Sequence, residues 1–87
     1  MLYRAHPSVS SKRLEDELIL VHLDTGFCFA LEGVGVRIWE LIEDGTTAHT
    51  LVETIASEYE VERERVVRDV DALMAEFLEH VLIVEEP

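Results

Sequence analysis

The sequence predicts an α+β fold in which a three-stranded antiparallel sheet is followed by three helices. Three observations carry that prediction. The apolar runs "ELILVHL" and "GFCFAL" flank "DTG", which is typical of a hairpin. From Gly33 the apolar spacing changes to that of helices, and no repeat or linker interrupts the 87 residues. A small sheet packed on three helices is a winged-helix-like arrangement, and we expect residues 1–87 to form one domain.

The sheet is predicted to begin with a short strand near Val9. Residues 18–23 alternate two apolar faces, which suits a middle strand. Gly26 can adopt the positive φ that the turn requires. The strand that ends at Leu31 has no apparent strand partner after it, so it should form an edge of the sheet.

Three helices are predicted from Gly33 onward. The first ends at Gly45, a good residue to follow a helix, and Thr47 is a good N-cap for the second. The third opens near Glu62, and its apolar stripe is about 140° wide, broader than a core-facing helix needs. Such a helix can line a groove as well as a core, although a small domain can also bury the whole stripe.

Composition excludes several classes of function. The 19 Asp and Glu residues outnumber the 7 Lys and Arg residues, which argues against nucleic acid and against an anionic membrane surface. No run approaches the roughly 20 apolar residues of a membrane span. Cys28 is the only cysteine and cannot form an internal disulfide. We therefore expect a cytoplasmic protein whose partner is neutral or basic.

No catalytic constellation is apparent. The four histidines, His6, His22, His49 and His80, lack the spacing of metal ligands. Cys28 lies mid-strand among aromatic residues, where a thiol is usually buried and inert. There is no glycine-rich phosphate loop. We expect no enzymatic activity, no cofactor and no metal.

Binding of a peptide is the class of function that remains. The edge strand "GFCFAL" carries no Lys, Pro or other device that stops foreign strands from pairing with it. Addition of a peptide strand gains affinity through main-chain hydrogen bonds and selectivity through side-chain pockets. The bare edge therefore predicts a visiting peptide, with the third helix as the wall of a groove.

The sequence also resembles the PqqD-like family of small precursor-peptide recognition elements. The resemblance rests on the apolar hairpin, "AL" leading into "GVGVRIWELI", "DGTT" before the second helix, and the closing "VVRDVDALMAEFLEHVLI". It covers nearly the whole chain. Glu32 is a departure, because family members often have an Asn N-cap there, so Gly33 is expected to begin the first helix.

The resemblance implies a non-catalytic protein that binds the leader segment of a ribosomally made precursor and presents it to processing enzymes. In the family the leader adds as a strand along the third strand and leans on the third helix. The binding residues carried over are Phe27, Cys28, Phe29, Ala30, Leu31, Val67, Asp71 and Met74. The opposite flank of the helix, with Val66 and Leu73, stays open as an alternative wall.

The pathway is less sharply defined. The turn "DTG" replaces the "PEG" of members that serve pyrroloquinoline quinone synthesis, and "GVGVRIWELI" is more similar to stand-alone members of lasso-peptide clusters. In those clusters the partners are a leader peptidase and a cyclase. The alternatives are a peptide chaperone for pyrroloquinoline quinone synthesis, a structural subunit that pairs with its own copy, and a winged-helix DNA binder, which the acidic third helix disfavours.

Overall fold

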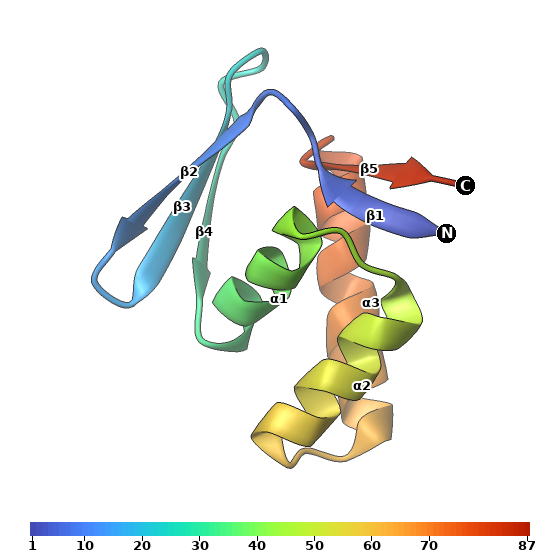
Figure 1. Cartoon of the computed structure of the whole chain (residues 1–87). Coiled ribbons are helices and arrows are strands. Elements are labelled where there is room, and N and C mark those ends of the chain that lie inside the picture. The colour runs from blue at the N-terminus through green and yellow to red at the C-terminus, as the bar shows by residue number, and fades with distance from the viewer.

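The structure, a computed structural model, describes residues 1–87 and has an α+β architecture (Figure 1). The strands are β1 (Leu2–Ala5), β2 (Val9–Leu14), β3 (Glu17–His22), β4 (Cys28–Glu32) and β5 (Ile83–Glu86). The helices are α1 (Val34–Glu43), α2 (Ala48–Tyr59) and α3 (Arg63–Glu79). The predicted three-stranded sheet followed by three helices is confirmed. The winged-helix likeness stays a prediction.

The three-stranded sheet has the order β2-β3-β4, and both pairings are antiparallel. In the register, Leu20 of β3 lies between Ser11 of β2 and Phe29 of β4. Leu18, Leu20 and His22 share the buried face of β3, because alternate side chains of a strand point the same way. β4 is an edge strand, as the sequence predicts.

A second sheet, which the sequence did not predict, joins the two ends of the chain. β1 pairs antiparallel with β5, with Leu2 opposite Glu86, so the termini lie side by side (Figure 1). The amide of Tyr3 donates to the carbonyl of Thr46 at 2.7 Å, which attaches β1 to the α1–α2 connection. The β1–β5 pair thus brings the two ends of the chain together next to the C-terminal end of α3.

The core lies between the inner face of the large sheet and the helices. Trp39 of α1 packs edge-on against Phe77 of α3, with ring centroids 5.3 Å apart. The indole Nε1 of Trp39 is buried without a hydrogen-bond partner. The core comprises sixteen buried apolar residues: Leu18, Leu20, Leu31, Val36, Ile38, Trp39, Ile42, Leu51, Val52, Ile55, Val66, Val70, Met74, Phe77, Leu82 and Ile83.

Local signals set the helix boundaries. Thr47 is the N-cap of α2, and its Oγ1 accepts a hydrogen bond from the amide of Thr50 at 3.1 Å. Gly45 follows the end of α1 with a φ of 84°, a conformation that glycine adopts without strain. Both predictions are confirmed. Gly33 is the N-cap of α1 and offers no side-chain hydrogen bond.

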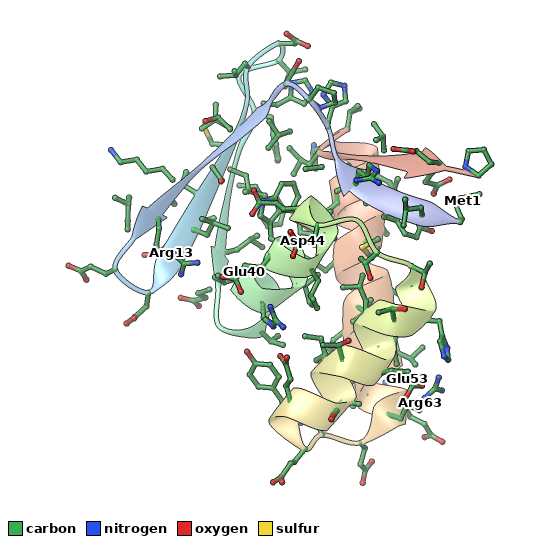
Figure 2. The ribbon with its side chains drawn as sticks, viewed as in Figure 1. Met1, Arg13, Glu40, Asp44, Glu53 and Arg63 are labelled. Carbon is green, nitrogen blue, oxygen red and sulfur yellow. The ribbon has the colours of Figure 1, made fainter.

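Ion pairs connect the outer surfaces of the elements. Figure 2 shows Arg13 of β2 near Glu40 of α1, and these groups are 2.9 Å apart. Arg37 of α1 binds Glu58 of α2 at 2.9 Å. These pairs are partly or fully exposed, so each contributes little to stability. No helix combines the length and the apolar character needed to cross a membrane.

Candidate functional site

The edge of β4 is chemically different from the opposite edge of the same sheet. β2 has two cations, Lys12 and Arg13, in the middle of its edge, and such charges discourage pairing with other chains. β4 has the sequence "CFALE", with its only charge at the last residue, Glu32. It contains no proline or lysine. One edge of the sheet is therefore protected and the other is open.

The register shows which amides of β4 face outward. The amide of His22 donates to the carbonyl of Phe27 at 2.9 Å, so these two residues form a hydrogen-bonded pair. Such pairs alternate along an antiparallel ladder. Phe29 and Leu31 therefore direct their backbone groups toward β3. Cys28 and Ala30 direct theirs outward, and their amides have no partner within the chain.

Aromatic contacts hold β4 beside α3. Phe27, just before β4, stacks on His80 with ring centroids 3.8 Å apart and an interplanar angle of 8°. Phe29 meets Phe77 edge-on at 5.8 Å. His80 follows Phe77 by three residues, close to one helical turn, and Phe29 follows Phe27 by two residues on the strand. These contacts fix the distance between the open edge and the helix.

Leu73 continues this row one turn earlier on α3. A Cβ placed on Gly35 would lie 3.2 Å from Leu31 Cδ2 and 3.9 Å from Leu73 Cδ2, so both leucine side chains reach the same glycine. Leu31 is buried, whereas Leu73 is half-buried. Leu73 is therefore a partly exposed apolar residue of α3 close to the end of β4.

The predicted helical wall lies elsewhere on α3. At 100° per residue, Asp71 is about 160° around the helix from Leu73, and Val67 is about 120° away. Met74 is a core residue with only 6% of its surface exposed. The structure thus places Val67 and Asp71 on another side of α3 from Leu73, and it places Met74 in the core. The flank with Leu73, left open by the sequence, is the one that lies close to the end of β4.

The other predicted residues divide by face. Phe27, Phe29 and Leu31 point inward and carry the contacts with the helices. Cys28 and Ala30 are exposed on the outer face of the sheet. The expectation of a buried Cys28 is wrong, because no helix covers that face of β4. Val66, the other residue of the alternative flank, is in the core.

The surface beside the β4 edge is acidic. Asp69 and Glu76 lie one turn before and after Leu73 and are both exposed. Arg65 is the nearby cation, and its Nε is 3.9 Å from the carboxylate of Asp69. The chain forms no cluster of three or more His, Cys, Asp or Glu residues that could hold a metal ion. The site thus offers an open backbone edge and negative charge.

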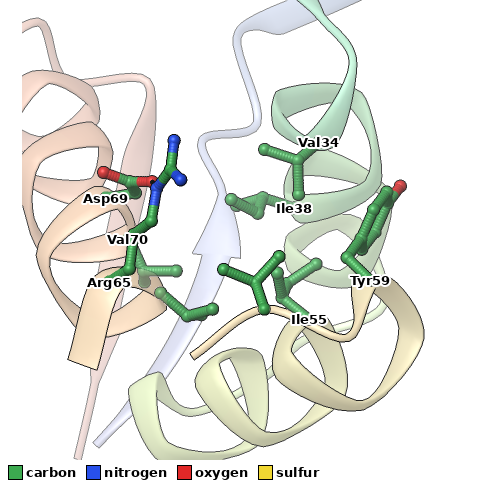
Figure 3. A pocket seen from close by; sticks show the side chains of 9 residues that line it. Val34, Ile38, Ile55, Tyr59, Arg65, Asp69 and Val70 are labelled. Atoms are coloured by element: carbon green, nitrogen blue, oxygen red, sulfur yellow. Dashed lines mark ion pairs between the residues drawn. The ribbon is translucent and has the colours of Figure 1, made fainter. Parts of the chain in front are cut away.

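A pocket of about 230 Å³ opens where α1, α2 and α3 meet (Figure 3). The pocket could not be predicted from the sequence, because its walls come from α1, α2, α3 and the connection between α2 and α3. Seven of its nine lining residues are hydrophobic. The lining residues are Val34, Ile38, Ile55, Tyr59, Val61, Arg65, Val66, Asp69 and Val70.

Two solved structures are similar to this chain over almost its whole length. TbiB1 in complex with the TbiA(beta) leader peptide is 34% identical, with a TM-score of 0.87, and the match covers 97% of this chain and 98% of that chain. Lasso peptide synthetase B1 complexed with the leader peptide is 25% identical, with a TM-score of 0.83, and the match covers 95% and 98% of the two chains. No curated protein matches the sequence.

The family assignment rests on a match that spans most of the chain. Residues 17–83, from the start of β3 to the start of β5, match the family described as coenzyme PQQ synthesis protein D (PqqD). This range includes β4, all three helices and every residue of the pocket. The chain belongs to the PqqD family.

Proposed function

We propose that this protein binds the leader segment of a ribosomally made precursor peptide by adding it as a strand to β4. The observation that carries the proposal is the pair of outward amides at Cys28 and Ala30 on an edge without protecting residues. An incoming strand would satisfy both amides and the adjacent carbonyls. The 34% identity to TbiB1, solved with a leader peptide, supports the same role.

The bound peptide would lie between the β4 edge and the flank of α3 that carries Leu73. That apolar side chain gives a contact for alternate residues of the peptide. Asp69 and Glu76 on either side favour a peptide with basic or neutral residues, since opposite charge assists encounter and selection. The proposed groove uses this flank of α3 in place of the one with Val67 and Asp71.

The protein acts without catalysis and presents its peptide to a leader peptidase and a cyclase of a lasso-peptide pathway. Both solved relatives bind leader peptides, and one is named a lasso peptide synthetase B1, which supports this role. The family description allows the alternative of pyrroloquinoline quinone synthesis. The genes beside this one distinguish the two, because a lasso pathway requires a precursor, a peptidase and a cyclase gene. A cytoplasmic location stays a prediction.

Titration calorimetry with the leader peptide of the precursor encoded beside this gene tests the binding. We expect one peptide per chain with a dissociation constant between micromolar and nanomolar, or about −8 to −12 kcal/mol. Ordering a disordered leader costs a few kcal/mol, so a few anchor side chains should dominate an alanine scan. A scrambled leader is the control. Equal binding of both peptides would contradict sequence-selective recognition.

Light scattering distinguishes leader binding from pairing of two β4 edges. Two identical edges could form a symmetric dimer through the same strand. The proposal predicts a monomer that becomes a one-to-one complex with the leader. A dimer that persists at saturating leader concentrations would favour the structural subunit instead.

Mass spectrometry of the precursor incubated with the protein alone tests the absence of catalysis. We expect the precursor to remain intact, because Cys28 Sγ is exposed and its only hydrogen bond is to the carbonyl of Gly26 at 3.7 Å. Leader cleavage that disappears in Cys28→Ser would show an enzyme.

A further inference from the structure

One of the contacts between the open strand and α3 lies at the surface. Phe29 meets Phe77, which is fully buried, and Leu31 belongs to the core. The stack of Phe27 on His80 differs, because both side chains are only half-buried and neither belongs to the sixteen core residues. This contact can therefore be removed without opening the core.

The position of the His80 ring is determined by the end of α3. His80 is the C-cap residue of this helix, and its amide donates to the carbonyl of Glu76 at 3.1 Å. The amide of Leu82 donates to the carbonyl of Phe77 at 2.8 Å, which fixes the chain on the other side of His80. The ring centroids of His80 and Phe27 are 3.8 Å apart, so the two faces are in van der Waals contact. The helix end thus offers Phe27 a fixed surface.

The backbone of Phe27 is part of the β3–β4 ladder. Its carbonyl accepts from the amide of His22 at 2.9 Å, and the amide of Gly26 donates to the carbonyl of His22 at 2.8 Å. These bonds close the ladder at the turn. Cys28 follows directly and carries the first of the two outward amides. A contact that holds Phe27 therefore also holds the start of the open edge.

We propose that His80 is a positioning residue for peptide binding, whose ring holds the start of β4 extended through its stack on Phe27. This inference rests on the proposed function and adds to it a residue that acts through Phe27 and not through contact with the peptide. Chain segments with few buried contacts open locally more readily than core segments. A strand that is already extended loses less conformational entropy when a peptide pairs with it.

The proposal uses the flat face of the imidazole ring, so another aromatic ring should replace it. Phenylalanine at position 80 can lie on the face of Phe27, whereas alanine leaves that face uncovered. Contacts between aromatic rings change equilibrium constants by roughly twofold to tenfold beyond the area they bury. The effect on binding should lie in this range, because only the start of the edge depends on the stack.

Titration calorimetry with the leader peptide of the precursor encoded beside this gene tests the role of the ring. We expect His80→Ala to weaken leader binding about threefold to tenfold, within the range of an aromatic contact. His80→Phe should bind the leader as tightly as the wild type does. The matched control is His49→Ala, which removes an exposed histidine of α2 and should leave the affinity unchanged. Thermal melting checks that each variant is folded.

Hydrogen exchange of the free protein, measured by NMR, separates positioning from a general loss of stability. The amide of His22 reports on the start of β4, because it donates to the carbonyl of Phe27. In His80→Ala this amide should exchange several-fold faster, while the amide of Val70, in the middle of α3, should change little. Equal acceleration of both amides would show that His80 stabilises the whole fold, and it would overturn the positioning role.

A double-mutant cycle tests the path through Phe27. In the background of Phe27→Leu, which has no ring for His80 to cover, His80→Ala should cause no further loss of leader affinity. An undiminished loss in this background, full affinity of His80→Ala, or no recovery in His80→Phe would overturn the proposal while leaving strand addition intact. Failure of the wild type to bind the leader would instead contradict the proposed function itself.

Discussion

The amide of His22 donates to the carbonyl of Phe27 at 2.9 Å, and this bond sets the phase of the whole β3–β4 ladder. Because hydrogen-bonded pairs alternate, Phe29 uses its amide within the sheet, whereas Ala30 does not. The two adjacent positions therefore have opposite roles. One supports the fold and the other is available to a partner.

Ala30→Pro should abolish leader binding while lowering the melting temperature only modestly. Proline removes the outward N–H that an added strand needs, but that group has no partner in the free protein. Phe29→Pro is the matched control, because it removes an inward N–H and an aromatic contact with Phe77 and should unfold the protein. Calorimetry and thermal melting measure the two effects. A folded Ala30→Pro protein with full leader affinity would contradict strand addition.

Leu73→Asp should weaken leader binding by about tenfold or more, and Val67→Asp should leave it nearly unchanged. Both residues are half-buried on α3, but only Leu73 lies on the flank that reaches the end of β4. Because the two side chains are similarly buried, we expect the two substitutions to reduce folding stability by similar amounts. Titration calorimetry compares the affinities, and melting temperatures provide the stability control. If Val67→Asp weakened leader binding more than Leu73→Asp did, the result would favour a groove lined by Val67 and Asp71.

Thr47→Ala should lower the free energy of unfolding by about 1 kcal/mol, because the first turn of α2 loses its cap. The hydroxyl of Thr47 accepts from the amide of Thr50 at 3.1 Å. His49→Ala, at an exposed position of the same turn, is the control and should cost much less. Urea denaturation measures both. Leader affinity should be the same in both variants, because α2 begins far from β4.

The contribution of Glu58 to stability should disappear in acid. The hydrogen bond from Arg37 lowers the pKa of Glu58 below its ordinary value of 4.5. A carboxyl whose pKa is depressed by folding stabilises the protein above the pKa of the unfolded chain, and it loses that effect as the pH falls through the folded pKa. Wild type should therefore melt slightly higher than Glu58→Gln at pH 7. The two should converge near pH 3, and a difference that persists there would contradict the assignment.

Local signals made much of the fold predictable. Alternation of apolar residues predicted β3 and β4, and Thr47 and Gly45 predicted the helix boundaries, because strand faces, caps and turns depend on residues close together in the sequence. The open edge was predictable for the same reason, since it follows from what β4 lacks. β1 and β5 were missed because each has four residues and gains its pairing only from the opposite end of the chain.

The sequence by itself determined the hairpin, the bare strand and a third helix with a broad apolar stripe. Only the tertiary structure decided which flank of that stripe faces the strand. Val67 and Leu73 are both apolar and lie on opposite sides of the stripe, so periodicity cannot choose between them. The stacking of Phe27 on His80 and of Phe29 against Phe77 rotates α3 so that Leu73 meets the end of β4. The pocket likewise exists only because three helices, separated in sequence, converge.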